Sequence, residues 1–430
     1  MKTKLKELLN NILKLLAKAM VWRYRPGIVG VTGSVGKTSA KHAIAAVLGS
    51  ERHVRESRGN FNNETGLSLT ILGDWKDSEL KLFSREYGPG ENTLRKAWFM
   101  LKVFAVATWK LIFKGTYPEL IILEYGVDKP GDMKYLLEIA KPNIGVVTAV
   151  GEIPAHVEFF AGPEFVAREK SRLIEYLPAA GFAVLNYDDQ TVMDMRERTR
   201  ARTITFGFGE GADIRITNFE NKFELGKFCG IAFKIEYAGS VVPVRLENVF
   251  GKAQAYAAAS GACAGLIFGI NLVKIAEALR GYKPASHRMN LISGIKETWI
   301  LDDSYNASPM SMHAALDTLK SLKAKRKIVV LGDMLEIGKY TIEAHEAVGK
   351  LAAKSADIIV TVGARAKFIA DAARKKKTIK KNIISFDTAD DARIPVQELL
   401  KKGDLVLVKA SHAMELEKVV EEIRLPEELK

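Results

Sequence analysis

The chain has 430 residues, which is enough for about three domains of ordinary size and for several buried cores. Hydrophobic residues make up 47% and charged residues 27% of the sequence, so a fibrous or wholly disordered protein is excluded. The net charge of +13 favours polyanionic partners, and the presence of only two cysteines excludes a disulfide framework and favours the cytoplasm.

Two segments in the first quarter of the chain combine apolar and basic residues. Residues 4–20 predict an amphipathic helix that Pro26 and Gly27 end, so residues 1–26 form a separate N-terminal element. Residues 95–115 are a second aromatic and basic segment, which could pair with the first; neither has the apolar run of a membrane-spanning helix. Two interpretations stay open for both: packing on the protein itself, or peripheral contact with the inner face of a membrane. The apolar side of the first helix is Leu5, Leu8, Leu9, Ile12, Leu15, Leu16 and Ala19.

From Gly27 onward, short β-rich runs alternate with helical stretches, which predicts βαβ units and a mostly parallel sheet. These runs are IVGV, LIILEYG, IGVVTAV and FAVLNYD. Four runs between residues 203 and 246 have no helices between them, which predicts an antiparallel appendage at the sheet edge. Helices at about 252–267 and 272–281 complete a central domain of residues 27–284.

The alternation restarts near Pro284 with the runs WILDD, KIVVLGD, DIIVTVG, NIISFD and DLVLVKAS. This pattern predicts a separate Rossmann-like, doubly wound domain of residues 285–430. The predicted fold class is therefore α/β, with a mostly parallel central sheet that carries an antiparallel appendage, followed by the doubly wound domain.

A glycine-rich turn follows the first β-rich run and leads into a helix. The turn reads Thr32-Gly33-Ser34-Val35-Gly36-Lys37-Thr38, with the helix continuing from Ser39. Such a turn offers backbone N–H groups and a helix N-terminus to phosphates, Lys37 adds a positive charge, and the Thr38 hydroxyl can reach Mg²⁺. The central domain is thus predicted to be a P-loop-type ATPase domain that binds ATP through residues 32–34 and 36–39.

Three further side chains are candidates for a metal site beside this turn. Glu124 ends an apolar strand at the carboxyl edge of the predicted sheet, where ligand sites of open α/β sheets lie. His156 follows the next strand and could reach the same crevice, although an isolated histidine is often a loop residue. Lys170 lies in a helical stretch and by pattern alone is a solvated charge.

These residues resemble the Mur ligase family of ATP-dependent, amide-forming enzymes, from Gly27 to Glu422. The turn at residues 32–38 is similar to the family's TGxxGK[ST] loop. The resemblance implies that Glu124, His156 and Thr38 hold magnesium, and that Lys170 is carbamylated to help bridge the metals. It also implies that Lys37, Lys170 and His156 are the catalytic residues. The segments GNFNNETG at 59–66, DDSYNASP at 302–309 and LGDMLEIG at 331–338 carry the resemblance further.

The resemblance also implies substrate contacts. Gln254, Arg288 and Asp303 are expected on the nucleotide, although Gln254 stands where the family has asparagine. Expected acceptor contacts are Asn60, Asn62, Asn63 and Glu64. Tyr305 and Asn306 are expected to bind substrate, and Ser411 and His412 to contact the amine, the last in place of an arginine. The family's N-terminal uridine-nucleotide-binding domain is expected to be absent.

The implied activity is an ATP-dependent, ADP-forming acid–amino-acid ligase of peptidoglycan precursor synthesis. Its expected partners are D-alanyl-D-alanine and a nucleotide- or lipid-linked muramoyl peptide, with ATP and Mg²⁺ as cofactors and a monomeric chain. No nucleic acid partner is expected, because no RNA-binding, zinc-finger or helix-turn-helix pattern stands out. Alternatives are a related ligase with another amino acid or cell-wall acceptor, a folate polyglutamate-type ligase, and a non-catalytic ATP-binding scaffold.

Overall fold

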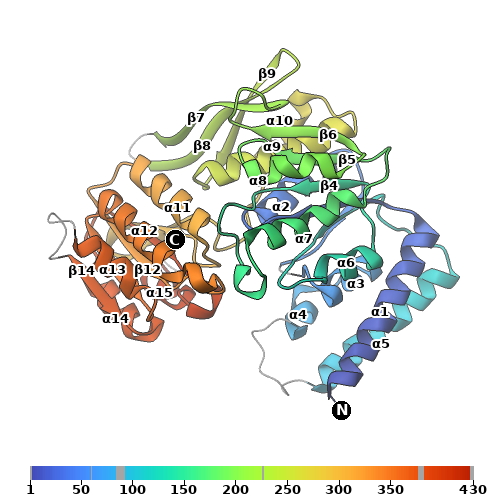
Figure 1. Ribbon diagram of the computed structural model, residues 1–430, viewed down its shortest axis with the longest axis horizontal. Helices are drawn as coiled ribbons and strands as arrows, with labels where there is room; N and C mark the ends of the chain where they lie inside the picture. Colours follow the sequence, from blue (N-terminus) through green and yellow to red (C-terminus); the bar gives the residue numbers. More distant parts are fainter. Residues whose placement is uncertain (1, 60, 84–92, 225–226, 376–381, 427–430) are drawn as a thin grey trace.

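The computed structural model describes residues 2–59, 61–83, 93–224, 227–375 and 382–426. These residues build two sheets, one of nine strands in the order β2-β3-β1-β4-β5-β6-β7-β8-β9 and one of six in the order β10-β11-β15-β12-β13-β14. The two sheets lie in separate halves of the molecule (Figure 1). The predicted α/β class is confirmed, while the predicted domain boundaries stay a prediction.

The larger sheet is parallel where it carries the glycine-rich turn. β1 pairs in parallel with β3 and β4, and β4 pairs with β5. The predicted antiparallel appendage is wrong for its first run, because β6 pairs in parallel with β5 and with β7. The antiparallel pairs are β7–β8 and β8–β9. The strands are β1 (Gly27–Thr32), β2 (Val54–Glu56), β3 (Leu120–Glu124), β4 (Ile144–Val147), β5 (Phe182–Asn186), β6 (Arg202–Gly207), β7 (Ile214–Glu224), β8 (Lys227–Tyr237) and β9 (Ser240–Glu247).

Helices cover both faces of this sheet because consecutive strand residues point to opposite sides. In β1, Val29 and Val31 join one apolar core while Ile28 joins the other. The first core takes α2 (Lys37–Gly49), α9 (Lys252–Ile267) and α10 (Leu272–Arg280). The second takes α1 (Lys2–Tyr24), α3 (Glu64–Leu72), α5 (Thr93–Ile112) and α6 (Asp132–Ile139). The remaining helices of this half are α4 (Asp77–Leu80), α7 (Pro163–Glu175) and α8 (Gln190–Met193).

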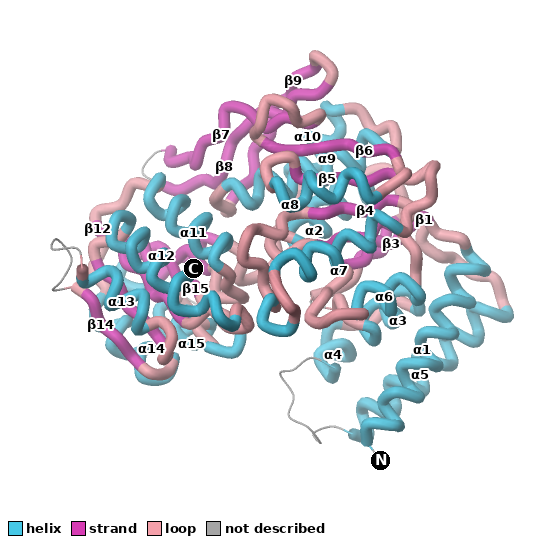
Figure 2. Tube along the Cα trace, in the orientation of Figure 1, coloured by secondary structure: helices cyan, strands magenta, loops and turns pink. Residues whose placement is uncertain are grey.

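The smaller sheet is a doubly wound domain, as predicted. Its strands pair in parallel except β10, an antiparallel edge strand that the sequence pattern did not reveal. The strands are β10 (Asn290–Gly294), β11 (Thr298–Asp302), β12 (Arg326–Gly332), β13 (Ile358–Val362), β14 (Ile383–Phe386) and β15 (Asp404–Lys409). Both faces carry helices (Figure 2): α11 (Pro309–Ser321), α12 (Thr341–Ser355) and α13 (Lys367–Arg374) on one, α14 (Ala389–Leu399) and α15 (Glu417–Ile423) on the other.

The two apolar and basic segments are α1 and α5, which lie side by side (Figure 1). Their C-terminal ends are joined, since the Tyr24 hydroxyl donates to the carbonyl of Lys110 at 2.9 Å, so the two helices run parallel. The predicted apolar side of α1 is mostly not the buried one: Leu9 and Leu16 are partly buried, but Leu8, Ile12 and Leu15 are exposed. The fully buried residues are Leu13, Ala17 and Met20, which were not predicted to lie on that side. None of the helices in the described part of the chain is long and apolar enough to cross a membrane.

Candidate active site

The glycine-rich turn between β1 and α2 has a backbone that only glycine adopts without strain. Gly33 and Gly36 have φ angles of +146° and +86°. A side chain at Gly33 would also collide with Thr148, whose hydroxyl oxygen would lie 2.1 Å from the added Cβ. The hydroxyl of Ser34 is buried in this turn without a hydrogen-bond partner among the described residues. A tight turn at a helix N-terminus with an unpaired hydroxyl fits a bound phosphate group.

Glu124, at the carboxyl end of β3, faces the first turn of α2. Its carboxylate accepts hydrogen bonds from the Thr38 hydroxyl at 3.0 Å and from the Asn62 amide at 3.2 Å, and Lys41 Nζ lies 3.8 Å away. Burial alone would raise the pKa of Glu124, but the charges of Lys41 and Lys37 hold it below its usual value. The carboxylate is therefore ionised at neutral pH, and together with the Thr38 hydroxyl it offers oxygen ligands of the kind that Mg²⁺ prefers.

Lys170 reaches the same turn from α7. Its Nζ donates to the carbonyl of Gly33 at 3.1 Å, and Lys37 Nζ donates to the same oxygen at 2.9 Å. Lys170 is buried, so the interpretation of a solvated charge is wrong. Burial, reinforced by the charge of Lys37, lowers the pKa of Lys170 to about 7. A large fraction of its amine is thus neutral at physiological pH.

His156 has contacts with both halves of the molecule. Its Nε2 lies 3.5 Å from a carboxylate oxygen of Asp128, in the loop after β3, and its Nδ1 lies 2.5 Å from one of Glu336, in the loop after β12. The contacts of His156 are thus with these two acids rather than with Glu124. No group of three or more histidine, cysteine or acidic side chains suited to a metal occurs among the described residues, so His156 as a magnesium ligand stays a prediction.

The expected nucleotide and amine residues gather where the C-terminal domain meets the central one. Gln254 donates to the backbone carbonyl of Arg288 at 3.0 Å, so its amide positions that loop. The Arg288 guanidinium lies 4.1 Å from the centre of the Tyr305 ring, and the His412 ring stacks on Tyr305 at 5.3 Å. The positive charge of Arg288 acts on the pKa of Lys37 and of Glu124, so Arg288 lies close enough to influence the site beside the glycine-rich turn.

Beside this stack, a buried ion pair fixes the loop after β11. Lys409 Nζ lies 2.6 Å from the Asp303 carboxylate and donates to the carbonyl of Asn306 at 2.7 Å. The Ser411 hydroxyl accepts a hydrogen bond from the backbone N–H of Leu335. Asp303, Asn306 and Ser411 are therefore brought together with the stack, but their contacts here stabilise the loops, and their substrate roles stay predictions.

Of the described residues expected to contact the acceptor, one lies beside Glu124 and the others make contacts that stabilise the fold. Asn62 contacts Glu124, as described above, whereas the Asn63 side chain caps α3 by accepting the N–H of Gly66 at 2.9 Å. Glu64 accepts a hydrogen bond from Asn10 of α1. Asn60 lies outside the described residues.

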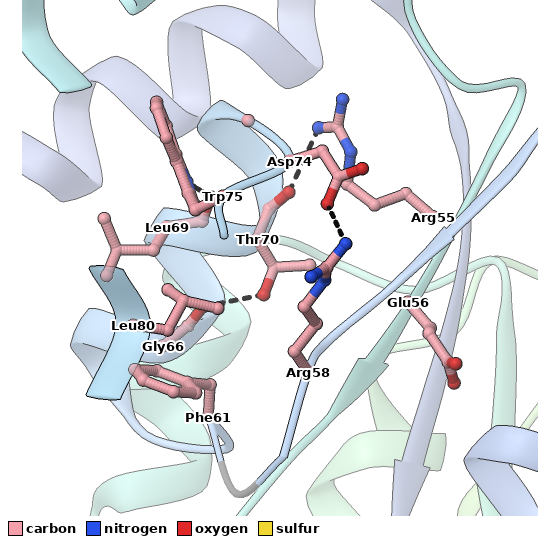
Figure 3. A pocket seen from close by; sticks show the side chains of 11 residues that line it. Arg55, Glu56, Arg58, Phe61, Gly66, Leu69, Thr70, Asp74, Trp75 and Leu80 are labelled. Carbon is pink, nitrogen blue, oxygen red and sulfur yellow. Dashed lines mark hydrogen bonds and ion pairs between the residues drawn. The ribbon is translucent and has the colours of Figure 1, made fainter. Parts of the chain in front are cut away.

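A crevice next to this loop is too small to be a substrate site (Figure 3). Its volume is about 10 Å³, enough for roughly one water molecule. Arg55 fills it by donating to the carbonyls of Thr70 and Ile71, and Arg58 pairs with Asp74 at 2.8 Å. The crevice is a packed seam that holds the acceptor-side loop against α3.

Comparison with known proteins agrees with this arrangement. Residues 108–264 match the family model described as Mur ligase middle domain, and residues 287–412 match that described as Mur ligase, glutamate ligase domain. The Bacillus subtilis protein named "UDP-N-acetylmuramoyl-tripeptide--D-alanyl-D-alanine ligase" is 31% identical over 418 residues, which span 96% of this chain and 79% of that protein. The chain belongs to the Mur ligase family.

Two further similarities extend over most of this Mur ligase. A Mycobacterium tuberculosis protein with the same name as the Bacillus one is 29% identical over 406 residues, covering 90% of this chain and 70% of that protein. The crystal structure of MurF ligase from Thermotoga maritima in complex with ADP matches with a TM-score of 0.77 and 27% identity, covering 96% of this chain and 83% of that one. The family resemblance of the sequence motifs is thereby confirmed.

Sequence reasoning missed three charged side chains of this Mur ligase. Lys41 is buried beside Glu124. Its position one helical turn after Lys37 could have indicated that it lies on the same side of the helix as Lys37. Asp128 follows Glu124 in the same loop and contacts His156. Glu336 belongs to a quoted motif, but its contact with His156 joins residues 180 positions apart, and no local pattern reveals such a contact.

Proposed function

We propose that this chain is an ATP-dependent ligase that joins D-alanyl-D-alanine to a UDP-N-acetylmuramoyl tripeptide, releasing ADP and phosphate. The observation that carries the proposal is the convergence of Lys37, Lys170, Thr38 and Glu124 around one glycine-rich turn. The names of the Bacillus and Mycobacterium relatives supply the substrate class, which the geometry alone does not specify.

The reaction has two steps that conserve atoms and charge. A carboxylate oxygen of the acceptor peptide takes the γ-phosphoryl group of ATP, and ADP leaves; the amine of the dipeptide then attacks the acyl carbon, losing a proton as phosphate leaves. Phosphoryl transfer depends mainly on positioning and charge neutralisation. Lys37 and the N-terminus of α2 would hold the phosphates, and Arg288 adds positive charge from the opposite domain.

Mg²⁺ fits the oxygen ligands that Glu124 and Thr38 present, with His156 as a further ligand once it is released from Glu336. When bound, the ion supplies Lewis-acid charge that offsets repulsion between the acceptor carboxylate and ATP. The unpaired Ser34 hydroxyl is the observation that favours a ligand in this turn.

Lys170 is suited to carbamylation, a modification that requires a neutral amine. The neutral amine adds to CO₂ and releases one proton, which gives an anionic, carboxylate-like carbamate at the magnesium site. A pKa of about 7 makes the neutral amine abundant at physiological pH, whereas an ordinary lysine is almost wholly protonated there. The unmodified ammonium would instead repel a metal ion.

The amine would bind between the C-terminal loops, where Tyr305 and His412 stack beside Asn306 and Ser411. The acceptor would approach Glu124 along the loop that carries Asn62. The proposal takes a nucleotide-linked acceptor over a lipid-linked one because the relatives are named for the nucleotide-linked substrate. It also includes a cytoplasmic location and a monomeric chain.

The test is phosphate release by the purified chain with Mg-ATP and the UDP-linked tripeptide, with and without D-alanyl-D-alanine, followed by product mass. We expect turnover only with both substrates and a product heavier by the dipeptide. Lys37→Ala should lower turnover at least about a hundredfold, whereas Lys274→Ala, on the surface of α10, should not change it. ATP binding without amine-dependent turnover would favour the scaffold, and turnover with a lipid-linked acceptor alone would replace the acceptor assignment.

A further inference from the structure

Helix α1 has two apolar stripes, and only one of them is used by the core. Leu13, Ala17 and Met20 are buried against the central domain. The second stripe follows the helical period at spacings of four, three and seven residues, and its side chains are 38% to 74% exposed. This exposed stripe consists of Leu8, Ile12, Leu15 and Trp22.

Helix α5 repeats the arrangement. Phe99, Val103 and Ala107 are buried, while a stripe on another side is 60% to 80% exposed. This stripe consists of Leu94, Trp98, Leu101, Trp109 and Ile112. Single exposed apolar residues are ordinary, but two contiguous stripes on neighbouring helices require an explanation. We call the two stripes together the α1–α5 face.

The two stripes belong to one layer of the molecule. The buried residues of both helices enter the same core, which also contains Leu67 and Leu69 of α3. Both helices therefore turn their buried sides toward α3 and their exposed stripes away from it. Figures 1 and 2 show the pair as an outer layer at the edge of the central domain, far from the C-terminal domain.

Most of the charged residues of α1 and α5 are basic. The two helices contain ten lysines and arginines and a single acidic residue, Glu7. Lys14 and Lys102 pair with Glu138 and Glu79 of the protein, but Lys18 and Arg95 are exposed on the two helices. A second copy of this chain would place the same mostly basic pair of helices against these, and the resulting repulsion disfavours self-association.

We propose that the α1–α5 face docks on the surface of an anionic lipid bilayer. Three exposed tryptophans suit the interface between headgroups and acyl chains, and the basic residues suit anionic headgroups. Both helices lie in the plane of the interface, because neither is apolar enough to span it. The proposal stands apart from the ligase reaction, since it rests on exposed residues that no step of that reaction uses.

Docking would bring the acceptor-side loop close to the lipid surface. Asn10 of α1 accepts a hydrogen bond from the Thr65 hydroxyl at 2.9 Å and donates to Glu64. One helix thickness, about 10 Å, thus separates the docked surface from the loop that carries Asn62. In the docked protein the acceptor side would face the membrane, and the C-terminal domain would remain free to move.

The experiment is flotation of the full chain with vesicles of phosphatidylcholine alone or of an equal mixture of phosphatidylcholine and phosphatidylglycerol. We expect binding to the mixed vesicles, at least about tenfold weaker binding to the neutral ones, and loss of binding at about 1 M salt, where charges are screened within about 3 Å. Tryptophan emission should shift to the blue on binding, because three of the five tryptophans lie on the face.

Variants distinguish vesicle binding through the α1–α5 face from non-specific binding by any exposed apolar residue. Trp22→Glu, Trp98→Glu and Trp109→Glu should each weaken vesicle binding at least about tenfold. Val273→Glu changes an apolar residue of α10 that is also more than half exposed, and it should not weaken vesicle binding. Thermal unfolding should show that all four variants are folded. The proposal is overturned if the unchanged protein does not float with the vesicles, or if Val273→Glu weakens vesicle binding as much as the tryptophan variants do. It is also overturned if light scattering shows a dimer that Trp98→Glu dissociates while no vesicle binding is found.

Discussion

Lys37 and Lys170 donate to one carbonyl oxygen, that of Gly33, at 2.9 and 3.1 Å. Two ammonium groups that share an acceptor in a buried place repel each other, and burial disfavours both charges. Burial lowers the pKa of both lysines, that of Lys170 to about 7. The turn thus holds two buried amines next to the proposed phosphate site, and a large fraction of the Lys170 amine is neutral at physiological pH.

The first prediction is that Lys170 takes up CO₂. In ¹³C-bicarbonate, the chain should give a carbamate resonance that disappears in Lys170→Arg, because guanidinium stays protonated. Activity should fall in CO₂-free buffer and return with bicarbonate. Lys274→Arg serves as the control, since the amine of Lys274 lies on the surface with its pKa raised by Glu51. A resonance that persists in Lys170→Arg would contradict the assignment.

The second prediction concerns stability in CO₂-free buffer. Below about pH 7 Lys170 is protonated in both the folded and unfolded states, so burial of the charge costs its full penalty. Between pH 7 and 10.5 the unfolded state binds more protons, and the free energy of unfolding rises with pH. Lys170→Met lacks this dependence. Its stability advantage over the unchanged protein should shrink by roughly 2 to 3 kcal/mol between about pH 6 and pH 9 in urea denaturation. An advantage independent of pH would show that the pKa is not lowered.

The third prediction tests Lys41, whose charge is the largest of those that lower the pKa of Glu124. Lys41→Met should raise that pKa, so on acidification the carboxylate would become protonated at a higher pH than in the unchanged protein. The acid limb of the pH profile of kcat/KM should therefore move up by about one unit. Lys41→Arg should restore part of the shift, because it returns the charge, and Lys274→Met should leave the profile unchanged. An unmoved acid limb in Lys41→Met would mean that Glu124 does not limit the reaction at low pH.

The sequence predicted the parts of the site that a local pattern encodes. The strand, glycine turn and helix around Lys37 form one continuous segment, so spacing alone indicated their arrangement. β6 was placed in the antiparallel appendage because no helix follows it, yet it pairs with β5. The direction in which a strand pairs depends on which edge of the sheet is free, and the sequence of a single segment does not contain that information.

Contacts between distant segments were beyond prediction for the same reason. Leu8, Ile12 and Leu15 of α1 were expected on one apolar side, and the buried residues Leu13, Ala17 and Met20 were not assigned to it. Which stripe packs is decided by α3 and α5, which approach from other parts of the sequence. The contact of Glu336 with His156 likewise depends on how the two domains meet.

The fourth prediction follows from that contact between domains. If His156 is a magnesium ligand, Glu336 competes with the ion for the imidazole, whose Nδ1 it approaches to 2.5 Å. Glu336→Gln should then lower the Mg²⁺ concentration for half-maximal activity several-fold, roughly the effect of one lost charge contact. Glu343→Gln on α12 is the matched control. A higher Mg²⁺ requirement in Glu336→Gln would instead indicate that Glu336 itself supports the ion.

The fifth prediction separates the amine site from the nucleotide site. The Tyr305 ring contacts both the Arg288 guanidinium, at 4.1 Å, and the His412 ring, at 5.3 Å, so it supports both side chains. Tyr305→Ala removes this support, worth about 1 to 2 kcal/mol, and should raise the KM for D-alanyl-D-alanine about tenfold with a smaller change in kcat. Tyr305→Phe should behave almost as the unchanged protein, because the ring stays. If instead the KM for ATP rises, Tyr305 acts through Arg288 on the nucleotide, and the amine must bind elsewhere between the domains.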